Sequence, residues 1–153
     1  MNMNDQKETA ISYAKKYLED LLSFFGLNTD VHATCEDDNV IELEVPSTHM
    51  NGFLIGQKGE TMHSLQFLVS SALRAKDYEL NRVNVDIAEY KKQRADRLIE
   101  KAKEWINTVK ESGEPMHLKP MNASDRRTIH KAADDYGLMT ESEGEGRDRH
   151  IVI

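Results

Sequence analysis

The stretch Leu54-Ile55-Gly56-Gln57-Lys58-Gly59-Glu60-Thr61 places a Gly-x-x-Gly turn between an apolar run and the start of a helix. Because neither glycine carries a Cβ atom, another backbone can approach closely, and the amides that open the helix can face an anion with their partial positive charge. Lys58 adds a mobile cation to the turn. The stretch makes a phosphate backbone the first partner to test, although a bare glycine turn is equally typical of an ordinary tight helix entry.

The residues on either side of the turn predict a strand ahead of it and a helix behind it. Apolar residues alternate over 40–45 and recur at helical spacing over 60–76. Further out, the patterns predict a helix over 6–25, a strand over 29–36 that forms a hairpin with 40–45, and a strand over 83–87. These elements together form a compact α+β unit that ends near Ala88.

Helix and strand patterns in the second half of the chain predict another small α+β unit. A long helix over 89–112 leads into it without a flexible linker and should join the two units. Asn122 is a good N-cap for a helix over 123–136, which Gly137 closes, and a hairpin of 138–143 and 148–153 ends the chain. We therefore expect two domains, at residues 5–88 and 89–153.

The net charge of −7 argues at first against a nucleic-acid partner, because phosphate contacts need local positive potential. The excess lies ahead of the glycine turn: residues 1–50 hold 3 basic and 10 acidic side chains, whereas residues 51–153 hold 17 of each. Residues 82–131 hold 12 basic and 8 acidic side chains, a net of +4. A modest basic surface is expected there, with weak and salt-sensitive binding.

Composition and spacing give little support to an enzyme or to a membrane protein. No apolar run approaches the length of a membrane span, and the polar start does not read as a signal peptide, so a cytoplasmic location is expected. Cys35, the single cysteine, follows the alternation of Val31 and Ala33 and is expected to be a buried strand residue. We predict no metal, no cofactor and no catalysis, because no catalytic motif is present and five histidines lack metal-ligand spacing. They are His32, His49, His63, His117 and His150.

Two sets of motifs resemble the bacterial Jag protein family. The run Gly52-Phe53-Leu54-Ile55-Gly56-Gln57-Lys58-Gly59-Glu60-Thr61, continued by Leu65-Gln66-Phe67-Leu68-Val69, is similar to the glycine loop and following helix of the family's KH domain. The second set resembles the family's R-3-H domain, named for its Arg-x-x-x-His pair. It consists of Glu114-Pro115-Met116, Pro120-Met121-Asn122, Asp125-Arg126-Arg127-Thr128-Ile129-His130 and Glu141-Ser142-Glu143-Gly144-Glu145-Gly146.

The resemblance implies a type II KH domain, with element order α-β-β-α-α-β and a short helical turn at 47–51, joined by a long helix to a small α+β R-3-H domain. In KH domains the glycine loop clamps the backbone of about four nucleotides while the bases lie on an adjacent apolar groove. This assigns phosphate contacts to Gly56, Gln57, Lys58 and Gly59. The groove candidates, which fit a plain core equally well, are Leu54, Ile55 and Ile41.

In the R-3-H half the family's phosphate-binding role falls on Arg126 and His130, which are four residues apart and so project from one helix face. Arg127 and Lys131 repeat this spacing one residue later. The alternative for His130 is a buried, hydrogen-bonded histidine. A stripe formed by Lys91, Arg94, Arg97 and Lys101 extends the basic surface or, with its interleaved acidic residues, forms an ordinary solvated helix face.

The implied function is single-stranded RNA binding by a non-catalytic cytoplasmic protein, a post-transcriptional regulator linked in the family to cell elongation, division or sporulation. Single-stranded DNA is an alternative ligand, and a small separate KH-domain protein is an expected partner. The alternative function is a protein-interaction scaffold that binds RNA weakly or not at all and docks a partner through its acidic N-terminal helix and sheet edge. Phe53 and Phe67 fit apolar packing as well as base stacking.

Two departures from the family pattern stand out. Its members usually carry a Jag domain and a charged linker ahead of the KH unit, so the chain reads as either a fragment or a short form. Gln57 also stands where the family commonly has Arg or Lys, which lowers the expected affinity for RNA.

Overall fold

The computed structural model describes residues 2–153 and divides into two compact units, of which the first ends at Lys91 and the second runs from Lys92 to Ile153. Each unit has its own core of buried apolar side chains. Both units combine helices with a small sheet, so the mixed α+β class expected from the sequence is confirmed. No helix among the described residues is long and apolar enough to cross a membrane.

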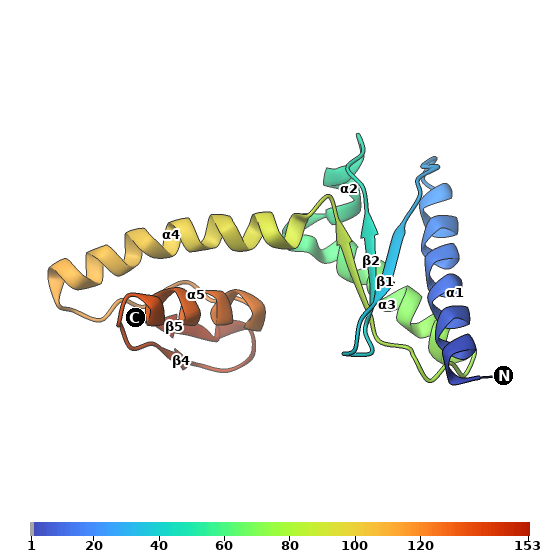
Figure 1. Ribbon diagram of the computed structural model, residues 1–153. Coiled ribbons are helices and arrows are strands. Elements are labelled where there is room, and N and C mark those ends of the chain that lie inside the picture. Colours follow the sequence, from blue (N-terminus) through green and yellow to red (C-terminus); the bar gives the residue numbers. More distant parts are fainter. Residues whose placement is uncertain (1) are drawn as a thin grey trace. The chain divides into compact units, whose positions relative to one another are not determined.

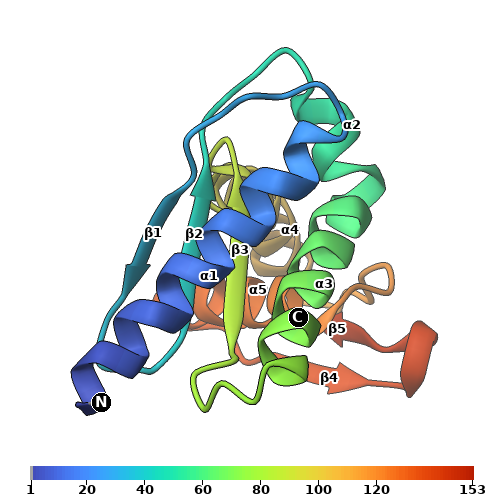
Figure 2. The same cartoon turned by 90° about the vertical axis from the view of Figure 1, so that its right-hand side faces the viewer.

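The first unit is a three-stranded sheet with two long helices against it (Figures 1 and 2). Its elements are α1 (Met3–Ser23), β1 (His32–Cys35), β2 (Ile41–Val45), α2 (Asn51–Ile55), the 3-10 helix η1 (Gln57–Gly59), α3 (Glu60–Ala75) and β3 (Val83–Ile87). β1 pairs with β2 in antiparallel orientation, as the expected hairpin, and β2 pairs with β3 in parallel orientation. Leu43, in the central strand, lies opposite Ala33 on one side and Val85 on the other.

Apolar periodicity explains how these elements share one core. Side chains recur every three to four residues along a helix and every second residue along a strand, so each element offers a single apolar face. β2 and β3 bury alternate residues and keep Glu42, Glu44, Asn84 and Asp86 on the other, more accessible face. The helical residues buried against them are Ala10, Ala14, Leu18, Leu22, Met62, Leu65, Val69 and Leu73.

The bounds of α1 differ from the expected 6–25. The helix begins at Met3 because Asn2 and Asp5 form a capping box: the Asp5 carboxylate accepts a hydrogen bond from the Asn2 amide at 3.2 Å, and Asn2 Oδ1 accepts one from the Met3 amide at 2.9 Å. It ends at Ser23, and the turn that follows includes Gly26 with φ 79°.

The second unit packs two helices against a hairpin. Its elements are α4 (Tyr90–Ser112), whose first two residues belong to the first unit, α5 (Ala123–Asp135), β4 (Glu141–Glu143), the 3-10 helix η2 (Gly146–Asp148) and β5 (His150–Val152). β4 and β5 are antiparallel, and residues 116–118 pair with the free edge of β5. The core residues are Ala102, Ile106, Leu118, Ile129, Ala132, Ala133, Ile151 and Ile153.

Two expectations about the first unit are wrong. The glycine turn does not follow a strand directly, because α2 lies between β2 and the turn, at 51–55 instead of 47–51. Residues 48–51 form the turn that opens this helix, in which Asn51 Oδ1 accepts a hydrogen bond from the Thr48 amide at 2.8 Å. Cys35 is half-buried instead of buried, because it is the last residue of β1, an edge strand.

Candidate nucleic-acid interface

The backbone itself needs both glycines of the turn between α2 and α3. Gly56 has φ 71° and Gly59 has φ 81°, a region that side chains disfavour. A Cβ atom on Gly56 would lie 2.3 Å from Thr61 Oγ1, and one on Gly59 would lie 3.1 Å from Tyr90 Cε1. The two glycines are therefore explained by local geometry, whether or not a ligand binds.

The residues between the glycines are the exposed part of the turn. Gln57 and Lys58 are exposed, and Lys58 has φ 54°, so its side chain leaves the turn from a left-handed conformation. Gly59 is the N-cap of α3 and has no side chain to accept hydrogen bonds from the first-turn amides. The positive end of the helix and the Lys58 ammonium favour an anion here, whereas the exposed Glu60 opposes one.

The apolar residues beside the turn divide into core and surface. Leu54 and Ile41 are completely buried and belong to the core, so of the three groove candidates Ile55, which is half-buried, is the accessible one. Phe53 on α2 is 56% exposed and Phe67 on α3 is 64% exposed. Neither ring is buried in the core, so both remain candidates for base stacking, although Phe53 also contacts the ring of Phe25.

On α5 the side chains of the Arg-x-x-x-His pair already have partners within the protein. Arg126 Nη1 donates a hydrogen bond to the Met121 carbonyl oxygen at 2.8 Å. The half-buried His130 ring contacts two hydroxyl groups, Thr140 Oγ1 at Nδ1 and Ser142 Oγ, at 3.1 Å, at Nε2. These contacts agree with the alternative of a hydrogen-bonded histidine.

The remaining cations of α5 are more accessible. Arg127 and Lys131 are both exposed, and they lie four residues apart on a helix surface. Among the three candidate residues on α5, Arg127 is thus the exposed one, and Arg126 is half-buried with one of its five donors used by Met121.

Arg94 is not a freely solvated member of a basic stripe. Its guanidinium group binds the Asp125 carboxylate through two contacts, Nε to Oδ1 at 3.2 Å and Nη2 to Oδ2 at 2.7 Å. Asp125 is 9% exposed and is the buried charged side chain among the described residues. This ion pair joins α4 to the N-terminal turn of α5, and spacing along the sequence did not reveal it.

Lys91 also has a structural role in the first unit. Its ammonium group donates a hydrogen bond to Asn84 Oδ1 on β3. Burial lowers the pKa of Lys91, while the nearby carboxylates of Asp86 and Glu42 act in the opposite direction. The predicted stripe is therefore not a continuous set of cations available to a ligand.

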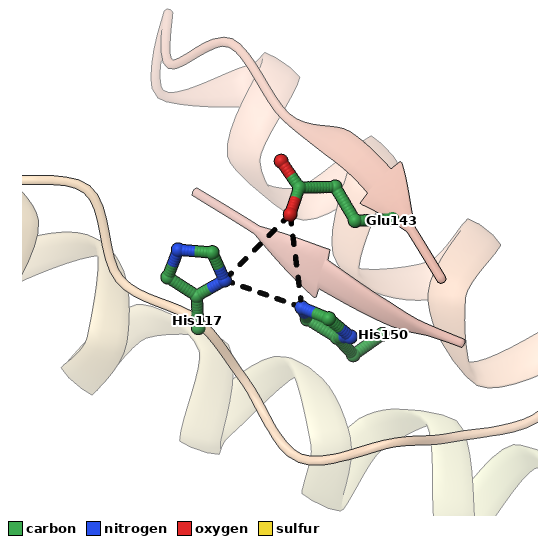
Figure 3. Close-up of side chains that lie close together, drawn as sticks. All are labelled: His117, Glu143 and His150. Carbon is green, nitrogen blue, oxygen red and sulfur yellow. Dashed lines mark hydrogen bonds and ion pairs between the residues drawn. The ribbon is translucent and has the colours of Figure 1, made fainter. Parts of the chain in front are cut away.

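Two of the histidines that lack metal-ligand spacing along the sequence lie close together in the structure. His117 and His150 come within hydrogen-bonding distance of each other, and Glu143 lies beside both (Figure 3). Sequence reasoning missed this group because its members are contributed by three different segments of the second unit.

Comparisons with known proteins place these features in a family. The R-3-H domain family matches residues 96–153. A protein of Clostridium symbiosum named RNA-binding protein KhpB is 32% identical over 150 residues, which cover 97% of this chain and 67% of the relative. A protein of the same name from Bacillus subtilis (strain 168) is 28% identical over 151 residues, which cover 97% of this chain and 72% of that relative.

The fold and the matched segment define a two-unit α+β protein whose second unit carries an R-3-H domain. The chain belongs to the KhpB family, which is the Jag family that its motifs resemble.

Proposed function

We propose that the chain binds single-stranded RNA through two surfaces, one on each unit. The first is the glycine turn, with the first unit acting as a type II KH domain over residues 5–88. The second is α5 of an R-3-H domain over residues 89–153. The observation that carries the proposal is the exposed Gln57-Lys58 tip at the N-terminus of α3. The names of the relatives, RNA-binding proteins, support the choice of ligand.

In the first unit the phosphate backbone passes over Gly56, Gln57, Lys58 and Gly59. The element order helix-strand-strand-helix-helix-strand, with the turn between the fourth and fifth elements, supports the KH interpretation. Bases next to the turn stack on the exposed ring of Phe53, because every base offers a π face to an aromatic side chain. Stacking on one ring contributes about 1–3 kcal/mol per base.

On α5 we assign the phosphate contacts to Arg126, Arg127 and His130. Arg127 contributes an exposed guanidinium group, and Arg126 contributes the donors that the Met121 carbonyl does not use. The His130 ring on this helix is held by the Thr140 and Ser142 hydroxyls, one at each ring nitrogen, so its contact with a phosphate replaces one of these two hydrogen bonds.

The test is fluorescence anisotropy of labelled single-stranded RNAs of random sequence with the full chain. In one variant, Gln57→Asp with Lys58→Asp, two anions occupy the tip. Asp tolerates the left-handed conformation at position 58, so the fold should be retained. The matched control is Gln6→Asp with Lys76→Asp, which makes the same charge change at exposed positions of the same unit.

We expect the tip variant to lose binding at low salt, because like charges repel the phosphates, while the control variant keeps it. Equal binding by the tip variant and wild type would move the site away from the glycine turn. Competition by single-stranded DNA of the same sequence tests the alternative ligand, since only RNA offers the 2′-hydroxyl group.

We infer, as the resemblance implies, that the protein is a non-catalytic cytoplasmic regulator of RNA linked to cell elongation, division or sporulation. A small separate KH-domain protein is its proposed partner. RNA recovered intact after prolonged incubation with Mg²⁺ and the purified chain is the expected result, and cleavage would contradict a purely binding role.

A second candidate function, a protein-interaction scaffold, has its own support in the first unit. Phe24 is 84% exposed, and Phe25 meets the exposed Phe53 edge to face at 5.3 Å between ring centres. Exposed aromatic rings are typical of protein interfaces. Absence of RNA binding by wild type at low salt would favour this function over the first.

A further inference from the structure

One face of the small sheet in the second unit carries a group of side chains with metal-binding chemistry (Figure 3). His117 lies on the segment that pairs with β5, Glu143 on β4 and His150 on β5. Glu143 is paired directly with His150 across the two strands, and His117 is paired with Val152, two residues along β5 from His150. Backbone register therefore brings the three residues to one face of the sheet.

The opposite face of the same sheet has a different role. Ile151 is buried in the core, and Ser142, its partner across the strands, contacts His130 of α5. Because successive side chains of a strand point to opposite faces, the histidine-glutamate group faces away from the proposed contacts of His130 with RNA. The proposed contacts with RNA therefore do not explain why these two histidines and the glutamate lie together.

Three potential ligand atoms converge within this group. His117 Nδ1 lies 3.2 Å from His150 Nε2, and Glu143 Oε2 lies 3.9 Å from the first nitrogen and 4.0 Å from the second. Two nitrogens bound to one tetrahedral zinc ion at about 2.0–2.1 Å lie about 3.3 Å apart. The nitrogens are already at this separation, and the half-exposed Glu143 carboxylate has to approach by roughly 0.6 Å to complete the arrangement.

A contact outside the group prepares His150 for a metal ion. Its Nδ1 lies 2.9 Å from the Asp148 carbonyl oxygen, which can only accept a hydrogen bond. The proton of a neutral His150 ring therefore belongs on Nδ1, and the lone pair of Nε2 points into the group. Metal-binding histidines commonly make this kind of hydrogen bond through the nitrogen that does not hold the metal.

We propose that His117, Glu143 and His150 bind a divalent first-row transition metal ion, with zinc as the expected ion. The ligand atoms are Nδ1, Oε2 and Nε2, and solvent takes the fourth, open position. Imidazole nitrogen and carboxylate oxygen are ligands that zinc accepts. The bound ion joins β4, β5 and the segment 116–118, which are otherwise connected at this face by backbone pairing.

A hydrogen-bonded group without metal affinity is the competing explanation. In that case the N–H group of His117 Nδ1 donates a hydrogen bond to His150 Nε2, and its hydrogen atom lies where the ion would lie. The two explanations differ in zinc affinity, which is measurable whether or not the chain binds RNA.

The test is isothermal titration calorimetry of Zn²⁺ into the full chain, free of any histidine tag and stripped of metal with a chelator. We expect one Zn²⁺ ion per chain. The variants His117→Ala, His150→Ala and Glu143→Gln should each weaken binding by at least the 10–100-fold that loss of an outer-shell partner costs. His49→Ala, an exposed histidine of the first unit, and Cys35→Ser, the single thiol, are controls that should bind as wild type.

A second readout guards against variants that fail to fold. Zn²⁺ should raise the melting temperature of wild type and of both controls by more than that of the Glu143→Gln variant, because ligand-induced stabilisation falls as affinity falls. Glu143→Gln alters one exposed side chain and preserves the backbone pairing. No saturable zinc binding by wild type would overturn the proposal, as would wild-type affinity in the three ligand variants.

Discussion

Gly56 and Lys58 have different roles in the glycine turn: the fold requires Gly56, and Lys58 is proposed to contact the ligand. The space that a side chain at Gly56 would need is filled by Thr61, so this position serves the fold. Lys58 is a non-glycine residue with positive φ, a conformation that costs about 1–2 kcal/mol, and its side chain is exposed. Strained residues of this kind concentrate at functional sites, which is a reason to place the ligand contact at Lys58.

Gly56→Ala should lower the free energy of unfolding by about 2–4 kcal/mol, because it adds a clash with Thr61 to an unfavourable backbone conformation. Chemical denaturation of the full chain measures this change. Gly52→Ala is the matched control, since Gly52 lies in α2 with open space around it; it should be neutral or stabilising by up to about 1 kcal/mol. Equal stability of the two variants would contradict the geometry described for the turn.

Arg94→Met should destabilise the second unit by about 2–3 kcal/mol, because it leaves the nearly buried Asp125 carboxylate without its guanidinium partner. The control is Lys103→Met, which removes an exposed ion pair with Glu100 on the same helix and should cost less than about 1 kcal/mol. Urea denaturation followed by Trp105 fluorescence compares the two. A loss in Lys103→Met as large as in Arg94→Met would show that burial of Asp125 is not the cause.

At the scale of elements, contacts of His130 connect α5 to the strand that follows it. Asn122 begins α5, its side chain accepting a hydrogen bond from the Asp125 amide at 2.8 Å, as the sequence predicted. The hydroxyl partners of His130 lie 10 and 12 residues further on, at Thr140 and Ser142. A helix pattern reveals the face on which His130 lies but not what this face contacts.

The variant Thr140→Val with Ser142→Ala removes both hydroxyl partners and keeps the imidazole ring. It should cost about 1–3 kcal/mol of stability, close to the effect of His130→Ala, because each variant breaks the same two hydrogen bonds. If His130 also contacts RNA, His130→Ala weakens binding more than the hydroxyl variant does, as measured by anisotropy. Wild-type stability of the hydroxyl variant would rule out a connecting role for these bonds.

The short elements were the hardest to predict. α2 has five residues, one of them Gly52, and is too short to show a helical repeat, so only the family resemblance implied a helical turn, slightly ahead of it. The long helices α1, α3 and α4 were predicted to within a few residues because each spans several turns of apolar repeat.

At the scale of the whole molecule, charge is distributed unevenly along the chain. The acidic excess lies in residues 1–50, and the exposed cations proposed to meet RNA lie in different units, Lys58 in the first and Arg127 in the second. Binding that uses both should release counterions at both surfaces. The dependence of RNA affinity on salt concentration therefore reports how many of these cations contact one RNA strand.

For single strands each phosphate contact contributes about −0.7 to the slope of log K against log salt concentration. Lys58→Gln and Arg127→Gln should each reduce this slope by about 0.7, and the double variant by about 1.4, when both units bind the same RNA. Lys76→Gln, an exposed lysine elsewhere on the first unit, should leave it unchanged. A double variant with the slope of a single one would mean that one unit binds RNA alone.

The α+β class, the long helices, the pairing of β1 with β2 and the family could all be predicted from the sequence. Each of these depends on local pattern: apolar repeats of 3.6 or 2 residues, a capping asparagine at Asn122, and glycines where the backbone turns. Such signals lie within a few residues of one another, so they can be read along the chain.

Which side chains contact one another could be seen only in the tertiary structure. Arg94 and Asp125 are 31 residues apart, and His117 and His150 are 33 apart. Helix packing in the first case and strand register in the second bring them together. The partial exposure of Cys35 likewise depends on β1 being an edge strand. Side-chain partners and exposure are set by the packing of distant segments, which no local repeat encodes, and the proposed RNA and metal sites both depend on them.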